Sequence, residues 1–209
     1  MRDGGEGSRV SGLWLVAGYA GVTGFFVLEA TTRRGGGASS LDASGDDRGT
    51  TGMIVGAYAL ASSLAPVLRH SALLPLPRRA APAGVVLQAV GLGARLWAMR
   101  TLGRSYSRTL RTETGQSVVD TGPYRLVRHP GYAGSLLIWT GFALTSSSLL
   151  VVALVGALMG TAYHRRMAAE EELLRRELPD YDDYCARTKK LIPFVGDGDQ
   201  LIPDDSGPP

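Results

Sequence analysis

Long stretches without a charged residue constrain this chain more than any other feature of its sequence. Four of them cover residues 10–28, 49–68, 80–94 and 131–163. A helix needs roughly 20 predominantly apolar residues to cross a membrane. The last stretch is too long for one crossing and suits two short helices joined at residues 145–148. The sequence therefore predicts an all-α, polytopic membrane protein with about five transmembrane helices.

Two of these helices have an alternative interpretation. Residues 80–94, which continue past Arg95, could form a buried helix of a soluble protein. Residues 10–28 could be a signal peptide, but this stretch is longer than the roughly 7–15 apolar residues of such a segment. Acidic residues precede it, and Leu28-Glu29-Ala30 is a poor cleavage site. We therefore expect a helix that the mature protein retains.

The distribution of lysine and arginine predicts the orientation of the five helices. One side of the membrane would hold five of the 22 basic residues and the other side sixteen, with Arg95 inside a span. Because cytoplasmic segments carry the excess of basic residues, we expect a cytoplasmic C-terminus and an outside N-terminus. The net charge of +3 then reflects topology, and no interleaving of aromatic and basic residues predicts nucleic-acid binding. The glycine- and arginine-rich composition is typical of a high-GC bacterium, so we expect the protein to lie in the cell membrane of such a bacterium.

The domain organisation follows from composition. Residues 1–195 are expected to form a single domain, within which the cytoplasmic loop at residues 31–49 is flexible because it has no apolar face. Residues 196–209, acidic and rich in proline and glycine, are expected to be a disordered tail. Two Gly-x-x-x-Gly pairs, at residues 52–56 and 156–160, allow close approach of helices in a bilayer. We expect them to pack within one chain, which favours a monomer over a dimer.

The densest polar chemistry lies at residues 122–134, directly before the last apolar stretch. The sequences at residues 122–123 and 129–131 each predict a turn. Pro130 suits the first position of a helix, because its ring fixes a helical backbone angle and its missing N–H is not needed there. The segment therefore predicts two turns that lead into a membrane helix.

This segment also offers binding groups. The backbone N–H groups at the helix start, with Arg125 and Arg128, would suit an anion or carboxylate. Tyr124 and Tyr132 can present aromatic faces to a cation. The alternative is a structural one, in which arginine and tyrosine only anchor the segment at the membrane interface.

Residues 163–178 predict a cytoplasmic helix after the last span. Four of its residues fall on one face by helical spacing, namely Met167, Glu171, Leu174 and Leu178. A carboxylate within an apolar stripe makes Glu171 a candidate site residue. Glu170 and Glu172 are more simply explained as solvated partners of arginines at four-residue spacing.

Two motifs in this order resemble the isoprenylcysteine carboxyl methyltransferases. The first is QSVVDTGPYRLVRHPGYAG, at residues 116–134. The second comprises Arg166, Glu170-Glu171-x-x-Leu174, Tyr181-x-x-Tyr184 and Ile192-Pro193-Phe194. The resemblance covers roughly residues 87–195. It implies an integral membrane enzyme that transfers a methyl group from S-adenosylmethionine to the carboxylate of a lipophilic, isoprenylcysteine-like acceptor, with a cofactor-binding core at residues 100–195.

The resemblance also implies roles for individual residues. In that family the matching positions bind the cofactor, which here are Gln116, Ser117, Val118, Val119, Tyr124, His129, Pro130, Gly131, Tyr132 and Glu170 or Glu171. Arg166 would contact the acceptor. The family often has histidine where this chain has Gln116, and the segment before Tyr181 is one residue shorter here. The choice between the two glutamates therefore stays open, and the helical-face argument favours Glu171.

Other functions remain open beside carboxyl methylation. A related class methylates phospholipid amines, and membrane sterol reductases that use NADPH share an Arg-His-Pro-x-Tyr-x-Gly segment. In that last class an acid tends to follow the final glycine, where this chain has Ser135. A non-catalytic membrane protein is the remaining alternative. No metal site is expected, because the three histidines lack ligand spacing and Cys185 is the one cysteine. The expected partners are a lipophilic acceptor and membrane lipids.

The predicted orientation can be tested by labelling single cysteines. In a Cys185→Ser background, a cysteine placed at Ser8 should react with a membrane-impermeant maleimide added outside intact cells, and one placed at Ser206 should not. Labelling of both positions, or of position 206 alone, would contradict the predicted topology.

Overall fold

The computed structural model describes residues 3–31, 49–68, 74–77, 79–103 and 118–193. Within these ranges the elements are the helices α1 (Asp3–Thr31), α2 (Thr50–Leu68), α3 (Ala80–Leu102), η3 (Gly122–Arg125), α4 (Pro130–Thr145), α5 (Leu149–Glu177) and α6 (Tyr181–Arg187). Two isolated β-bridges are present, but no strand occurs in the described part of the chain. The predicted all-α class is confirmed. The predicted flexible loop and the disordered tail lie outside the described residues.

Each predicted apolar stretch forms a helix, and the last one is divided where expected. Residues 146–148 separate α4 from α5. Ser147 adopts a left-handed backbone conformation with φ of 54°, and its N–H donates to the carbonyl of Leu144. A further bridge between Ser148 and Pro75 joins this turn to the segment before α3. Helices α4 and α5 can therefore run in opposite directions.

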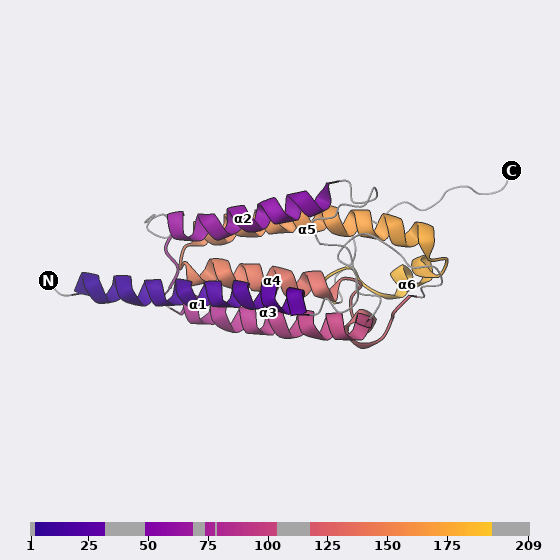
Figure 1. Ribbon diagram of the computed structural model, residues 1–209, viewed down its shortest axis with the longest axis horizontal. Helices are drawn as coiled ribbons and strands as arrows, with labels where there is room; N and C mark the ends of the chain where they lie inside the picture. The colour runs from indigo at the N-terminus through magenta and orange to yellow at the C-terminus, as the bar shows by residue number, and fades with distance from the viewer. Residues whose placement is uncertain (1–2, 32–48, 69–73, 78, 104–117, 194–209) are drawn as a thin grey trace.

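The five long helices lie side by side in two layers (Figure 1). Helices α1, α3 and α4 form one layer, and α2 lies along α5 in the other. Successive long helices alternate in direction, so that the ends of α1 and α3 meet the starts of α2 and α4 at one end of the bundle. The second half of α5, together with η3 and α6, extends beyond this end, which we call the site end.

Helices α3 and α4 make the most extensive contact in the bundle, and glycines allow it. A Cβ added at Gly91 would lie 2.6 Å from the carbonyl oxygen of Gly134, and one at Gly134 would lie 2.8 Å from that of Gly91. Gly84 and Gly141 form a second reciprocal contact of the same kind, near the start of α3 and the end of α4. Because a real side chain does not fit at such distances, the two backbones touch directly.

The two glycine pairs expected to bring helices together do not do so. A Cβ at Gly52, Gly56, Gly156 or Gly160 would meet nothing within 4 Å. Helices α2 and α5 instead pack through Ala57, Ala61 and Val155, which are buried in the same core cluster. The expectation of close intrachain packing at these pairs was therefore wrong, and the glycines lie on outward faces.

The predicted helix at residues 163–178 is not a separate element. It is the second half of α5, which runs without interruption from Leu149 to Glu177. No proline or glycine follows Gly160 before the helix ends, so nothing breaks the helix where the apolar residues give way to charged ones. At 29 residues and about 1.5 Å per residue, α5 exceeds the roughly 30 Å of a hydrocarbon core.

Two of the described helices are long and apolar enough to cross a membrane, Gly12–Thr31 and Thr50–Leu68. The other long helices differ from them for visible reasons. Helix α3 contains Arg95 and Arg100, α4 has 16 residues, and α5 becomes charged in its second half. The outward face of α3 is nevertheless apolar, since Val86, Val90 and Trp97 are all more than half exposed.

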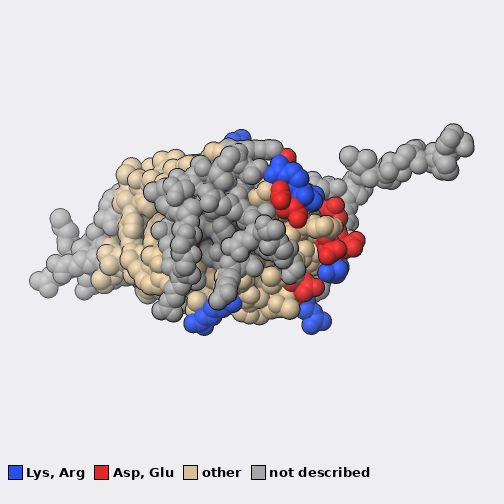
Figure 2. Space-filling view, turned by 45° about the vertical axis from the view of Figure 1, so that its right-hand side comes forward, with Lys and Arg blue, Asp and Glu red and all other residues tan. Residues whose placement is uncertain are grey.

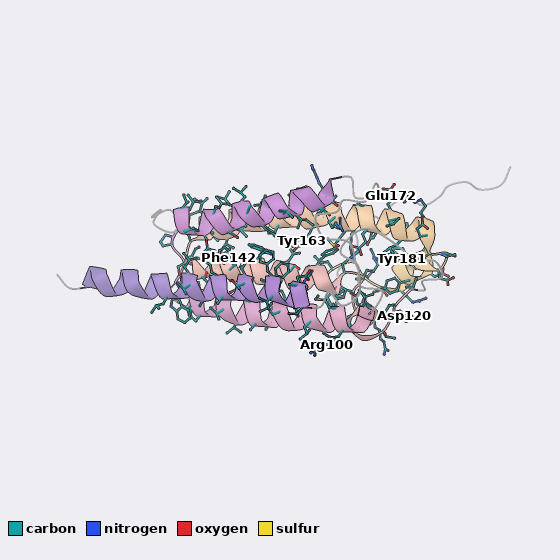
Figure 3. All side chains as sticks on the ribbon, in the orientation of Figure 1. Arg100, Asp120, Phe142, Tyr163, Glu172 and Tyr181 are labelled. Atoms are coloured by element: carbon teal, nitrogen blue, oxygen red, sulfur yellow. The ribbon has the colours of Figure 1, made fainter. Side chains whose placement is uncertain are left out.

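Charged side chains are unevenly distributed over the surface. Figure 2 shows those of the described residues gathered toward the end of the bundle that carries α6, whereas the other end is free of them on this face. In Figure 3, Phe142 and Tyr163 lie between the two layers of helices, and Glu172 and Tyr181 lie at the site end. On this face, the charged side chains of the described residues therefore gather toward the site end.

Replacement of a contact glycine should destabilise the bundle. We expect Gly134→Val to lower the free energy of unfolding by about 1–3 kcal/mol, because the new side chain meets the backbone of α3 and forces the two helices apart. Gly93→Ala, on the open side of α3, is the matched control and should be neutral or slightly stabilising. Thermal melting of both variants in detergent tests this, and equal melting temperatures would contradict it.

Candidate active site

The turn that precedes α4 is built as the sequence predicted. Gly122 has φ of 57°, a left-handed conformation that glycine adopts without strain, and it opens the short helix η3. His129 caps the following helix, and Pro130 occupies its first turn. The carbonyl of Tyr124 accepts a 2.7 Å hydrogen bond from the Tyr184 hydroxyl. The turn is thus attached to α6.

A second segment, residues 188–190, holds the same turn from the C-terminal side. The N–H of Arg128 donates to the carbonyl of Lys189 at 2.7 Å, and the N–H of His129 donates to that of Lys190 at 3.1 Å. Arg128 Nη1 also donates to the carbonyl of Thr188 at 2.6 Å. We call residues 188–190 the C-terminal strap. It fixes the turn through backbone hydrogen bonds.

Glu171 is the centre of the site. Its side chain is 4% exposed, and Oε1 accepts from Arg128 Nε at 3.0 Å and lies 2.9 Å from His129 Nε2. Lys190 Nζ lies 3.1 Å from Oε2, with Arg175 Nη2 at 3.9 Å from the same atom. One buried carboxylate therefore joins α5, the turn and the C-terminal strap, and two arginines, a lysine and a histidine surround it.

The pKa of Glu171 reflects this environment. Burial opposes ionisation, but the hydrogen bond and charge of His129, with those of Lys190 and Arg128, outweigh it and lower the pKa to about 2. A carboxyl group with a depressed pKa stabilises the fold above its ordinary pKa, and the stabilisation is lost as pH falls through the folded value. Glu171 should therefore stay ionised throughout the neutral and mildly acidic range.

Glu170 is bound to the same turn by a different residue. The Tyr132 hydroxyl donates a 2.7 Å hydrogen bond to Oε2 of Glu170. The Tyr132 ring stacks on His129, with centroids 5.6 Å apart, and contacts Tyr163 at 5.3 Å on its other side. Both members of the acidic pair thus meet the first residues of α4, Glu171 through His129 and Glu170 through Tyr132.

Arg166 points in another direction, toward the start of α2. Its Nη1 donates to the hydroxyl of Thr50 at 2.8 Å and to that of Thr51 at 3.2 Å. Arg166 is 3% exposed, and its charge acts on the Tyr132 hydroxyl together with that of Glu170. The guanidinium of Arg166 is therefore near the Tyr132 hydroxyl, which donates to Glu170.

The structure brings together most of the predicted site residues that it describes. His129, Tyr132, Glu170 and Glu171 are in direct contact, as shown above. Pro130 and Gly131 form the first turn of α4. Tyr124 is buried and contributes its carbonyl to the fold, and Val118 packs with Leu178, Tyr181 and Tyr184. The described contacts do not place Val119 in the site, and Gln116 and Ser117 lie outside the described residues.

One expected pair is separated. Arg125 and Arg128 were expected to act together on an anion, but Arg125 is exposed whereas Arg128 is buried against Glu171. The short helix η3 ends at Arg125, whereas Arg128 lies beyond it, where its backbone N–H donates to the carbonyl of Lys189. Arg128 therefore neutralises a carboxylate of the protein itself.

Several site residues were missed by sequence reasoning. Lys190 was noted only as part of the basic tail, and Thr50 and Thr51 only as the start of an apolar stretch. No local signal marks them, because their role depends on the packing of α2 against α5 and on the course of the C-terminal strap. Arg95, described further below, did carry a signal, since an ionisable residue within a span is a functional candidate by default.

Comparison with known proteins shows what this part of the chain is similar to. Residues 80–180 match the family described as phospholipid methyltransferase. The chain is 29% identical over 115 residues to a probable protein-S-isoprenylcysteine O-methyltransferase of Oryza sativa subsp. indica, covering 54% of this chain and 60% of the relative. The predicted resemblance to the isoprenylcysteine methyltransferases is confirmed. Residues 80–180 are therefore similar to the phospholipid methyltransferase family.

Other relatives carry different names. The chain is 31% identical over 111 residues to the nickel-cobalt-cadmium resistance protein NccN of Alcaligenes xylosoxydans xylosoxydans, covering 53% of this chain and 46% of the relative. It is 30% identical over 90 residues to the delta(14)-sterol reductase TM7SF2 of Mus musculus, covering 42% of this chain and 22% of the relative. The chain thus spans about half the length of its relatives. In the described part of the chain, no group of three or more His, Cys, Asp and Glu side chains could hold a metal ion.

The two glutamates should differ in their effect on stability. We expect Glu171→Gln to lower the free energy of unfolding by about 3 kcal/mol, because buried basic side chains lose their counter-charge. Glu170→Gln should change it by no more than about 0.5 kcal/mol, since an amide oxygen can still accept from Tyr132. Thermal unfolding at pH 7 without added ligand measures both, and equal losses would contradict the assigned roles.

Proposed function

We propose that this protein is an integral membrane methyltransferase that uses S-adenosylmethionine and methylates the carboxylate of a lipophilic acceptor. The observation that carries the proposal is the convergence of Glu170 and Glu171 on the turn at residues 128–132. Each carboxylate contacts a different aromatic or imidazole side chain of that turn. The family of residues 80–180 and the isoprenylcysteine methyltransferases among its relatives support the reaction class.

The donor set fits S-adenosylmethionine. The cofactor has a sulfonium and an ammonium group, a carboxylate and an aromatic base. The site has two carboxylates, stacked aromatic faces at His129 and Tyr132, and three basic side chains around the single carboxylate Glu171. Cations are attracted to aromatic faces and acids, and basic groups such as Arg128 and Lys190 suit the cofactor carboxylate. When bound, the cofactor supplies an electrophilic methyl group and departs as a neutral thioether.

The two glutamates would have different tasks in this site. Glu171 already has cationic partners on both carboxylate oxygens, so it would order Arg128, His129 and Lys190 for the ligand. Glu170 is half-buried, and it accepts a hydrogen bond from the neutral hydroxyl of Tyr132. Glu170 would therefore face the positive part of the cofactor. This assignment differs from the one that helical spacing favoured.

Arg166 would bind the acceptor. A carboxylate acceptor is ionised near neutral pH, so methyl transfer to it needs no general base. The chain would contribute orientation, with Arg166 held by Thr50 and Thr51 and aligned with the acceptor carboxylate in a fork geometry. Arg166 and Glu171 are five residues apart on α5, about 140° around an ideal helix, which agrees with their contacts on different elements.

The distribution of charge supports the proposed membrane topology. The basic residues that surround the site lie at one end of an apolar bundle, as the positive-inside rule expects of a cytoplasmic end. The alternation of the five long helices places the N-terminus of α1 at the other end. We therefore propose five spans in a bacterial cell membrane, an outside N-terminus and a cytoplasmic site.

Methylation of a phospholipid amine is the second candidate, because the matching family carries that name. An amine must lose a proton before it attacks, so that reaction should accelerate steeply with pH, whereas carboxylate methylation should not. The alternative of an NADPH-dependent reductase is supported by one relative, whose match covers 90 residues of this chain. Here Ser135 is fully buried and accepts a hydrogen bond from Arg95, so it has a structural partner in the bundle.

A binding and product assay distinguishes these functions. Purified protein in detergent should bind S-adenosylmethionine and not NADPH, as measured by calorimetry. Transfer of a radiolabelled methyl group to a prenylated cysteine analogue should give a product that releases methanol in mild alkali, which a methylated amine does not do. Binding of NADPH alone, or an alkali-stable product formed only from phosphatidylethanolamine, would overturn the proposal.

Substitutions should separate acceptor binding from cofactor binding. We expect Arg166→Ala to weaken binding of the acceptor, and Glu170→Gln to weaken binding of the cofactor. Each loss should be about 1.5–3 kcal/mol of binding free energy, the value of a charge-assisted hydrogen bond. Arg166→Lys should restore acceptor binding only in part, because the point charge of an ammonium group cannot replace the planar guanidinium, which can form two hydrogen bonds to one carboxylate. Titration of each variant with both ligands decides this. If both substitutions weakened the binding of both ligands equally, the separate roles of Arg166 and Glu170 would be contradicted.

A further inference from the structure

A buried ion pair lies inside the helix bundle, outside the cluster around Glu171. Arg95 of α3 places Nε and Nη2 each 2.6 Å from Oε1 of Glu29, near the end of α1. The side chains are 8% and 2% exposed. The guanidinium also lies 5.0 Å from the centroid of the Phe25 ring. Charges in such a place are costly and are retained where they act.

The same guanidinium holds the first turn of α4. Arg95 Nη1 donates to the carbonyl of Gly131 at 2.8 Å and to the hydroxyl of Ser135 at 2.6 Å. Gly134 lets the two helices approach closely here, since a Cβ at that position would lie 3.0 Å from the backbone nitrogen of Arg95. The start of α4 is therefore fixed along and around its axis by one side chain of α3.

The site residues lie on the same turn. Residues 131 and 135 share one face of α4, because they are four residues apart. Tyr132 projects about 100° away from Gly131 and binds Glu170, while His129 immediately before the helix binds Glu171. A rotation or shift of this turn would move His129 and Tyr132 together relative to α5.

We propose that Glu29 and Arg95 form a positioning pair that sets the first turn of α4 for cofactor binding. Glu29 orients the guanidinium of Arg95, and Arg95 holds the backbone of Gly131 and the hydroxyl of Ser135. The proposal rests on the proposed function for what the turn binds. It assigns a role in the site to α1, which lies outside residues 80–180 that match the family.

Two variants separate positioning from stability. Glu29→Leu/Arg95→Met removes both charges together, so no unpaired charge is left in the bundle. Arg95→Lys retains the charge pair but not the fork that reaches Gly131 and Ser135. Gln88→Met is the matched control, because Gln88 lies two turns earlier on α3 and ties it to α1 through the carbonyl of Gly18.

The local measurement is amide hydrogen exchange of Tyr132 and Ala133, whose N–H groups both donate to the carbonyl of His129. The second measurement is calorimetric titration of each full-length variant with S-adenosylmethionine. We expect the double variant and Arg95→Lys to accelerate exchange at these amides and to raise the dissociation constant about tenfold, as the loss of one charge-assisted hydrogen bond does. Gln88→Met should change neither quantity.

The outcomes are distinguishable. Unchanged exchange at Tyr132 and Ala133 in both variants would overturn the positioning role. Equal acceleration throughout α3 and α4, shared by Gln88→Met, would assign the pair to general stability and overturn it as well. If the unaltered protein did not bind S-adenosylmethionine, the proposed function would fail, while the exchange measurement would still decide whether the pair sets the turn.

Discussion

The buried carboxylate of Glu171 is the interaction on which the arrangement of the site depends. It joins α5 to the turn before α4 through Arg128 and His129, and to the C-terminal strap through Lys190. An ion of this kind in a low-dielectric environment is tolerated only when it is well paired, and loss of one partner is costly. Three segments distant in sequence are thereby required to meet at one point.

This requirement explains the form of the molecule around the site. The turn at residues 122–130 must expose its backbone N–H groups to the strap, which η3 and Pro130 allow. Helix α5 must continue beyond the apolar bundle to carry Glu171 to that turn, and it has no residue that interrupts it. The extensive contact of α3 with α4 supplies the rigid base, because glycines let the backbones touch. Glu170, Glu171 and Tyr132 thus project from helices, whereas Arg128 and His129 project from the turn that the strap holds.

The sequence was informative wherever a local pattern carried the physics. Uncharged stretches predicted the five long helices and the break at residues 146–148, and the Gly-Pro and His-Pro-Gly sequences predicted the turns. The acid within an apolar stripe drew attention to Glu171, which the structure places among buried basic side chains. Partners on distant elements were not predictable, because the choice of Lys190, Thr50 or Thr51 depends on tertiary packing. The glycine pairs at residues 52–56 and 156–160 misled, since small residues permit close approach without requiring it.

The first two helices are more than membrane anchors if these contacts are considered together. Thr50 and Thr51 of α2 hold Arg166, and Glu29 of α1 holds Arg95. Each arginine in turn contacts or acts on the first turn of α4, Arg95 through Gly131 and Arg166 through Tyr132. Two basic groups from different helices therefore converge on one short turn, and each is oriented by a residue outside the family region. The matched region alone would leave both arginines without these partners, in surroundings where an unpaired charge is most costly.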